Sequence, residues 1–183
     1  MNRANSIRII GGTWRSRLVT VGNVPGLRPT PDRVRETLFN WIEVRGGSNG
    51  LACLDLFAGS GILGFEAASR GADRVTFVER HAQACAALRA NAQKLAATQV
   101  EIIRGDALEF IASTERRFDL VFVDPPYRQQ LAEQVMPLLK RMMQPQGLAY
   151  VEAESPLAPP AGWQVFRQGR AGQVHFHLFE LTE

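Results

Sequence analysis

Cysteine is scarce in this chain: Cys53 and Cys85 are the only two among 183 residues, which excludes a disulfide framework. No apolar run approaches the roughly 18 residues that a membrane-spanning helix needs, so we expect no membrane partner. No apolar stretch follows the polar residues 1–6, so we expect no signal peptide and a reducing, cytoplasmic setting. At about 150 residues per domain, the length and the 45% hydrophobic content predict one globular domain with a short extension. The oligomeric state stays open, with a monomer as the default.

Lysine is also scarce, because all but two of the 21 basic residues are arginine, whose planar fork of donors matches phosphate. In residues 1–45 eight arginines stand against three acidic residues, a net +5, so the remainder carries −2 of the overall +3. Residues 7–12 and 18–21 predict a small hairpin, and we expect a basic arm over 1–24 and the main domain over 25–183. Such an arm indicates a polyanionic partner such as nucleic acid, or else a solubilising extension.

From residue 51 onward, short apolar runs alternate with segments of helical period. The alternation predicts an α/β fold with a doubly wound, mostly parallel sheet. Residues 162–167 and Val174–Leu181, joined by a glycine-rich connection, predict an antiparallel hairpin at the sheet edge. Pro137 lies inside the second helical stripe, so that helix should kink or begin late. The runs are 51–57, 74–78, 100–103, 119–123 and 148–151, and the stripes are Cys85, Leu88, Ala92, Leu95 and Leu131, Val135, Leu138, Met142.

The segment Thr30-Pro31-Asp32 is typical of a helix start, with Thr30 as the N-cap and Pro31 at the first helical position. Arg33 and Arg35 lie off the apolar stripe of this predicted helix, so both should reach solvent or a ligand. The stripe consists of Val34, Leu38 and Trp41.

A glycine-rich loop follows the first predicted strand of the main domain. Gly59, Gly61 and Gly64 fit the G-x-G-x-x-G spacing, and Glu79 follows Gly59 by 20 residues, as in dinucleotide-binding proteins. Asp55, at the end of the preceding strand, would repel a diphosphate but suits a cofactor with an ammonium or sulfonium charge. The loop therefore favours a positively charged nucleoside cofactor over a dinucleotide.

Acidic residues end three successive predicted strands: Asp55, Glu79 and Asp106. The carboxyl ends of parallel strands share one rim, where open α/β sheets bind ligands. Glu79 would accept hydrogen bonds from ribose hydroxyls, and Asp106 from an exocyclic amine, although an acid in that place also caps helices.

The sharpest motif is Asp124-Pro125-Pro126-Tyr127, directly after a buried strand. The prolines fix the backbone, so the Asp124 carboxylate and the Pro125 carbonyl can converge on one point. Two acceptors that hold the hydrogens of an amino group on a planar base would aim its lone pair at an electrophile. Tyr127 can stack on that base.

With these motifs the chain resembles the class I S-adenosylmethionine-dependent methyltransferases that modify amino groups, and more narrowly the bacterial 16S rRNA guanine-N2 methyltransferase family. Residues 55–61 and 124–127 support the broad class, and residues 25–40 carry the narrow assignment. The resemblance implies a Rossmann-like, seven-stranded sheet with an antiparallel last strand. It also implies methyl transfer to N2 of one guanine of 16S rRNA (guanine-966 in the family's naming) in the small ribosomal subunit or a late assembly intermediate.

The resemblance also assigns roles by position. The cofactor-binding residues it implies are Thr30, Asp55, Phe57, Gly59, Gly61, Glu79, Asp106 and Ala107. The target-base clamp it implies comprises Asp124, Pro125, Pro126 and Tyr127. The RNA contacts it implies are Arg15, Arg17, Arg28, Arg33 and Arg35. Whether Asp124 or water takes the proton after transfer stays open.

Three alternatives stay open. A nicotinamide oxidoreductase fits the glycine spacing but leaves Asp55 and the turn at 124–127 without a role. A methyltransferase acting on an adenine amino group of DNA or RNA, or on a protein glutamine, fits the turn, although the basic arm argues against a protein acceptor. A non-catalytic RNA-binding module would need a degenerate pocket, whereas the acids are intact. We expect no metal site, because His175 and His177 lack further ligands at suitable spacing.

Overall fold

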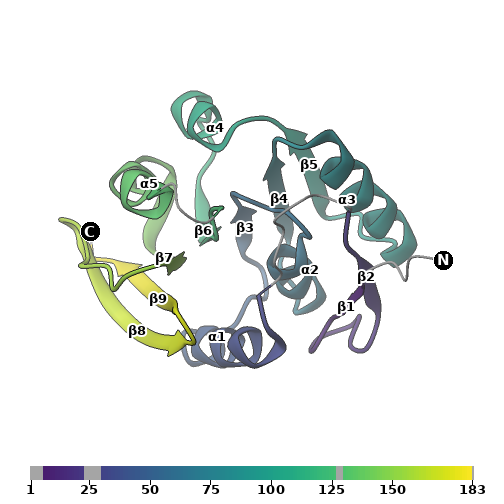
Figure 1. The fold of residues 1–183 in the computed structure, drawn as a ribbon, viewed down its shortest axis with the longest axis horizontal. Coiled ribbons are helices and arrows are strands. Elements are labelled where there is room, and N and C mark those ends of the chain that lie inside the picture. Colours follow the sequence, from purple (N-terminus) through teal and green to yellow (C-terminus); the bar gives the residue numbers. More distant parts are fainter. Residues whose placement is uncertain (1–5, 23–29, 127–129, 183) are drawn as a thin grey trace.

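A seven-stranded mixed sheet forms the centre of the computed structural model, which describes residues 6–22, 30–126 and 130–182 (Figure 1). A separate two-stranded ribbon precedes it. The strands are β1 Ser6–Arg8, β2 Leu18–Thr20, β3 Ala52–Asp55, β4 Arg74–Glu79, β5 Val100–Arg104, β6 Phe118–Val123, β7 Met143–Ala153, β8 Trp163–Ala171 and β9 Val174–Leu181. The helices are α1 Asp32–Val44, α2 Ile62–Ser69, α3 Ala82–Leu95, α4 Ala107–Ser113 and α5 Leu131–Leu139, with a 3-10 turn at Lys140–Met142.

The order of strands in the main sheet is β5-β4-β3-β6-β7-β9-β8. The first five are parallel to their neighbours, and β9 pairs antiparallel with both β7 and β8. The order reverses between β3 and β6, the place where open α/β sheets bind ligands. The predicted α/β fold, the edge hairpin and the small amino-terminal hairpin are confirmed.

Helices cover both faces of the sheet. Successive strand residues point to opposite sides, and apolar side chains on both sides need a helical layer to pack against. Cys53 and Phe77 belong to a core packed under α1, α2 and α3, whereas Leu54 and Val78 belong to a second core under α4 and α5. Figure 1 shows the same division into two helical layers. This doubly wound arrangement explains why the central strands are almost continuously apolar.

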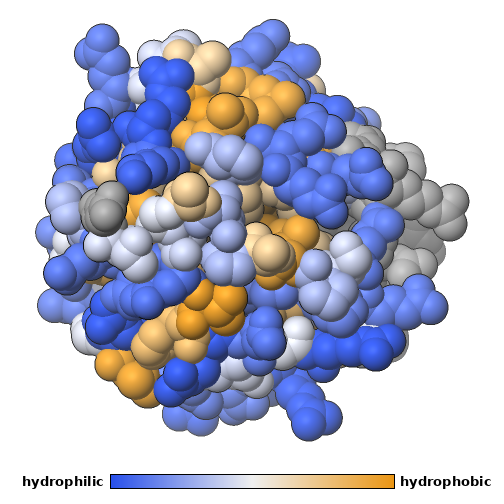
Figure 2. Space-filling view, turned by 90° about the vertical axis from the view of Figure 1, so that its left-hand side faces the viewer, coloured by the Kyte–Doolittle hydropathy of each residue, from blue (hydrophilic) through white to orange (hydrophobic). Residues whose placement is uncertain are grey.

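The edge strand β8 is polar toward solvent, with exposed Gln164, Arg167, Gln168 and Arg170. Figure 2 views the molecule from the side of α5, β8 and β9 and shows hydrophilic side chains over most of this face, with apolar ones in separate patches. Charged side chains on an edge strand disfavour pairing with another chain.

Two local predictions are wrong. Helix α5 includes Pro137 and begins at Leu131, so it does not begin late, and Leu138 of the predicted stripe is 42% exposed instead of buried. The buried face of α5 instead uses Ala132, Val135, Met136 and Leu139. Helix α1 begins at Asp32 with Pro31 as its N-cap, so Thr30 is not the cap and Pro31 is not the first helical residue.

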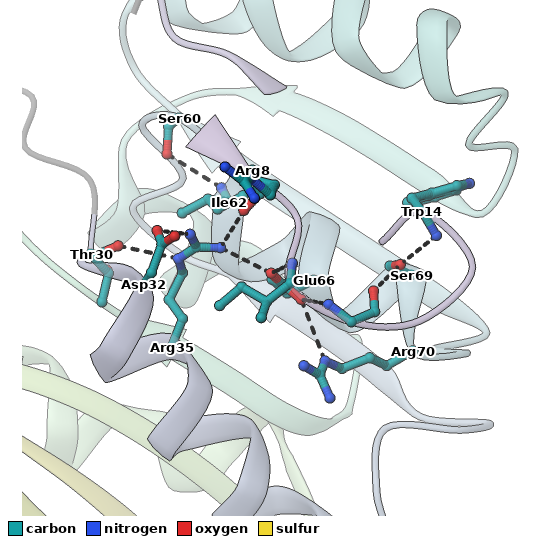
Figure 3. A network of polar contacts seen from close by, with 12 residues as sticks. Arg8, Trp14, Thr30, Asp32, Arg35, Ser60, Ile62, Glu66, Ser69 and Arg70 are labelled. Carbon is teal, nitrogen blue, oxygen red and sulfur yellow. Dashed lines mark hydrogen bonds and ion pairs between the residues drawn. The ribbon is translucent and has the colours of Figure 1, made fainter. Parts of the chain in front are cut away.

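The prediction that Arg35 reaches solvent or a ligand is wrong, because its side chain has no exposed surface. Its Nη1 lies 2.9 Å from Oε1 of Glu66, which is equally buried on α2, and it also donates to the Arg8 carbonyl. Its Nη2 binds Asp32 at 2.6 Å. Figure 3 shows the guanidinium between the start of α1, the arm and α2. A burial pattern by helical period could not reveal a charge paired across 31 residues.

Glu66 completes the attachment of the arm. Its Oε1 accepts the Ile10 N–H at 2.5 Å, and its Oε2 accepts the Gly11 N–H at 3.3 Å. Ser69, one turn later on α2, binds the Trp14 N–H and the Gly11 carbonyl. The segment between β1 and β2 is therefore fixed to α2 by its own backbone.

We expect Glu66→Gln to lower the free energy of unfolding by about 3–5 kcal/mol, because it removes the buried partner of the Arg35 charge and leaves only the exposed Asp32. Denaturant unfolding followed by circular dichroism measures the loss. The matched control is Glu101→Gln, which breaks an exposed pair with Arg116 and should cost at most about 1 kcal/mol. Equal losses in the two variants would contradict the structural role of the buried pair.

Candidate active site

The three acidic residues at the strand ends lie along one rim of the sheet, as predicted. Asp55 is the last residue of β3 and pairs in register with Phe77, two residues before the end of β4 at Glu79. Asp106 follows β5 by two residues and caps helix α4. The parallel arrangement brings these side chains to the same edge.

Asp55 is buried beneath the glycine loop, and its Oδ2 accepts the Gly64 N–H of α2 at 3.1 Å. Burial raises its pKa to about 8, an increase opposed by the Gly64 hydrogen bond and reinforced by the charge of Glu79. A positive charge bound nearby would favour the ionised carboxylate. The site thus fits a cationic ligand and disfavours a diphosphate.

Glu79 holds the glycine loop from the neighbouring strand. Its Oε2 accepts the Gly59 N–H at 2.9 Å, and its Oε1 accepts the His81 N–H at 2.7 Å. Asp106 accepts the N–H groups of Leu108 and Glu109, so the helix-capping role considered above is present. Glu79 and Asp106 therefore stabilise the loop and the helix start at the rim, in addition to lying along it.

The glycines of the loop meet real steric limits. Gly59 and Gly61 have φ angles of 51° and 74°, a region that favours glycine. A Cβ on Gly61 would lie 2.3 Å from Cδ2 of Leu88, and a Cβ on Gly64 would lie 2.3 Å from Phe77. Half-buried Phe57 and buried Ala107 flank the same rim. Because the glycines carry no side chains, the loop backbone itself forms the surface of the rim, and a nucleoside could approach it closely.

Beside this rim, a cavity of about 220 Å³ opens where β6 and β7 end. Asp124, Pro125 and Pro126 line it from the end of β6, and Glu152 lines it from β7. Glu133 and Glu154 add two further carboxylates. Four carboxylates thus line the cavity, against two side chains that can donate, Gln130 and Ser155, and this excess of acceptors suits a planar base that presents N–H groups.

Thr30 connects the two carboxylates at the base of this cavity. Its Oγ1 lies 3.0 Å from Oε1 of Glu152 and 3.4 Å from Oδ2 of Asp124. The Tyr150 hydroxyl donates to the same Glu152 oxygen at 2.8 Å. Burial, followed by the charges of Glu152 and Asp55, raises the pKa of Asp124, and burial likewise raises the pKa of Glu152.

Sequence reasoning missed Glu152 and Tyr150. Their signal was the period of two along β7, which places both on one face, and an acid one residue beyond the apolar run that ends at 151. That run was treated as a structural strand alone.

The remaining predicted residues fall into separate groups. Arg15, Arg17 and Arg33 are exposed, and Arg17 donates to the Lys94 carbonyl. Arg28 and Tyr127 lie outside the described residues. Cys53 and Cys85 are buried, and burial raises the pKa of both thiols. Across residues 6–22, 30–126 and 130–182, side chains form no metal-binding group, and no helix is long and apolar enough to cross a bilayer.

The doubly wound sheet with an antiparallel β9, together with the acidic rim, defines a class I methyltransferase. The chain belongs to the family described as Conserved hypothetical protein 95, whose model matches residues 7–180. It is 42% identical to Ribosomal RNA small subunit methyltransferase D of Haemophilus influenzae, over 98% of this chain and 96% of the relative. It is 41% identical to the protein of the same name from Escherichia coli K12, over 97% and 91%. The solved structure of Escherichia coli yhhF superposes with a TM-score of 0.88 at 42% identity, covering 97% and 99% of the two chains.

The raised pKa of Asp55 predicts a pH-dependent stability. Between its unfolded value near 3.8 and about 8, the folded state holds a proton that the unfolded state releases, so stability from this group is full at low pH and lost as pH rises through 8. We expect the free energy of unfolding to fall by up to ~1.4 kcal/mol per unit between pH 5 and 7 from this group. Urea unfolding across that range should show a shallower fall in Asp55→Asn. The exposed Asp73→Asn should keep the wild-type slope, and equal slopes in all three proteins would refute the assignment.

Proposed function

We propose that this chain transfers a methyl group from S-adenosylmethionine to the exocyclic N2 of a guanine in 16S rRNA, within the small ribosomal subunit or a late assembly intermediate. The observation that carries the proposal is the acceptor-rich cavity at Asp124, Pro125 and Glu152. Guanine presents N–H groups at both N1 and N2 on its pairing edge, whereas adenine presents an acceptor at N1. Relatives at 41–42% identity carry the name of a small-subunit rRNA methyltransferase, which supports an RNA substrate.

The residues proposed to hold the cofactor are seven on the rim and Thr30 beside the neighbouring cavity. The seven are Asp55, Phe57, Gly59, Gly61, Glu79, Asp106 and Ala107. When bound, S-adenosylmethionine supplies an electrophilic methyl group. The Glu79 carboxylate gives the site negative charge, which favours a sulfonium ligand. The bound sulfonium charge would in turn favour the ionised form of Asp55. Glu79 also fixes the loop through Gly59, so the loop is formed before the ligand arrives.

The chemical task of the clamp is orientation. The Asp124 carboxylate and the Pro125 carbonyl accept the two hydrogens of the amino group, which directs its lone pair toward the methyl donor. Positioning of this kind can supply ~7–11 kcal/mol of the barrier. Asp124 also stabilises the positive charge that develops on the nitrogen. A paired base could not enter the cavity, so the target base is expected in a loop or turned out of its helix.

The RNA surface is proposed to include exposed Arg15, Arg17 and Arg33, together with Arg28. Arg35 is withdrawn from this set, because its guanidinium is buried against Glu66. A short basic arm over 1–24 on a domain over 25–183 offers few phosphate contacts. This fits a cytoplasmic monomer that docks on a preassembled particle.

Asp124→Ala is expected to abolish methyl transfer while cofactor binding persists, because the clamp loses one of its two acceptors. The measurement is transfer of labelled methyl groups to unmodified small subunits, free 16S RNA and duplex DNA in parallel, with identification of the labelled nucleoside and calorimetry of the cofactor. Asp73→Ala, which removes an exposed acid before β4, serves as the control and should remain active.

The wild-type enzyme should yield N2-methylguanosine on small subunits. Label found only in N6-methyladenine would replace the guanine assignment with the adenine alternative. A normal rate in Asp124→Ala would remove the clamp from the mechanism, and a failure of the wild type to bind S-adenosylmethionine would favour a non-catalytic RNA-binding module.

Arg33→Gln is expected to weaken binding to small subunits and to reduce the slope of log affinity against log salt by about 1, the effect of one lost phosphate contact. Arg116→Gln is the control, since Arg116 precedes β6 at the opposite end of that strand from Asp124 and pairs with Glu101. Binding can be followed by filter retention at several salt concentrations. Identical salt slopes in wild type and Arg33→Gln would exclude a phosphate contact.

A further inference from the structure

The contacts around Thr30 contain one hydrogen too few for two ionised carboxylates. A hydroxyl donates once, yet Oγ1 of Thr30 lies within reach of both Glu152 at 3.0 Å and Asp124 at 3.4 Å. With both acids ionised, one carboxylate would face a lone pair of Oγ1. A single added proton resolves the conflict, because the protonated acid donates to Oγ1 while Thr30 donates to the other acid.

We propose that Thr30 and Glu152 form a proton relay behind Asp124, which returns Asp124 to its ionised form after each methyl transfer. The proposal rests on the function proposed above. Neither residue touches the reacting nitrogen in this scheme, so both are positioning residues that act through Asp124. In this scheme Thr30 carries protons from Asp124 of the target-base clamp, in addition to any contact with the cofactor.

The relay conserves protons and electrons. After transfer, an N–H bond of the methylated amino group breaks and an O–H bond forms on Asp124. That proton passes to Oγ1 of Thr30 as the Thr30 hydrogen passes to Oε1 of Glu152. Glu152 can take this proton because it lines the cavity and first gives the proton shared in the resting cluster to water. One proton therefore remains between the two acids after each transfer, Asp124 is ionised again, and the Tyr150 hydroxyl holds the Glu152 carboxyl group in place.

The surrounding charges favour a shared proton. Asp55 faces Asp124 from β3, and the mutual repulsion of the acids adds to burial in raising the pKa of Asp124. The Thr30 backbone is itself fixed, since its carbonyl accepts Nε of Arg35 at 3.2 Å. The other titratable groups on packed elements are Glu133 of α5, Glu154 after β7, and His175 and His177 of β9, which pair in register with Ala153 and Val151.

The test is the pH dependence of single-turnover methyl transfer to small subunits at saturating cofactor. Thr30→Val should slow the plateau rate by about tenfold or more, within the range of general acid–base effects. Because the Thr30 hydrogen bond lowers the pKa values of both acids, its loss should move the acidic limb to higher pH. Glu152→Gln removes a charge that raises the pKa of Asp124, so the acidic limb should move to lower pH while the plateau also falls.

Three controls separate relay from packing. Thr30→Ser keeps the hydroxyl and should restore rate and profile. Thr37→Val makes the same substitution on α1, where the hydroxyl meets only the Arg33 carbonyl among described contacts, and should behave as wild type. Calorimetry reports whether Thr30→Val also weakens cofactor binding.

Opposite shifts of the acidic limb in Thr30→Val and Glu152→Gln, with rescue by Thr30→Ser, establish the relay. A wild-type rate in Thr30→Val, or slower variants whose acidic limbs do not move, would overturn it. If Thr30→Val fails to fold, Glu152→Gln tests the relay alone: a lower plateau rate with the acidic limb moved to lower pH supports it, and an unchanged profile overturns it. A wild type that makes N2-methylguanosine while the relay predictions fail refutes the relay alone, whereas a different labelled nucleoside refutes the proposed function.

Discussion

The buried ion pair between Arg35 and Glu66 is the contact on which the arrangement of the other parts depends. One guanidinium binds the Glu66 carboxylate, the Arg8 carbonyl of the arm and the Thr30 carbonyl beside the cavity. Glu66 in turn accepts two backbone N–H groups from the arm, at Ile10 and Gly11. A buried pair is stabilising only when such extra hydrogen bonds satisfy its remaining donors and acceptors. Here they do, and in doing so they fix the arm, α1 and α2 in one geometry (Figure 3).

This geometry connects two parts of the proposed function. The arm and the start of α1 present Arg15 and Arg33 to solvent, while Thr30, held by the same arginine, reaches the carboxylates of Asp124 and Glu152. A rigid link places the proposed RNA-binding surface at a fixed position relative to the acid cluster. Positioning by a rigid element is more precise than positioning by a loop that orders on binding.

The sequence predicted the parts of the molecule that follow local rules. Apolar runs separated by helical stripes predicted the sheet. The acids at 55, 79 and 106 predicted its acidic rim, since the carboxyl ends of parallel strands meet at one edge. What it could not predict was pairing between distant residues. Arg35 was assigned to the surface because a helical stripe shows where apolar residues point and cannot show that a charge finds Glu66 on another helix. Thr30 was assigned as a helix cap for the same reason, since its partners are about a hundred residues away.

The cluster of Asp55, Asp124 and Glu152 shows why the sequence-based predictions failed near the candidate active site. Burial of an ionised carboxylate is unfavourable, and it raises the pKa values of Asp55, Asp124 and Glu152. Natural chains bury such groups chiefly where a ligand or a reaction makes use of them. An apolar residue at position 152 would leave the Thr30 and Tyr150 hydroxyls without their shared acceptor, and Asp124 without a second acid to share its proton. The proposed function supplies such a use, because two acids that share a proton can hold the amino group of a base and take up the proton that it loses.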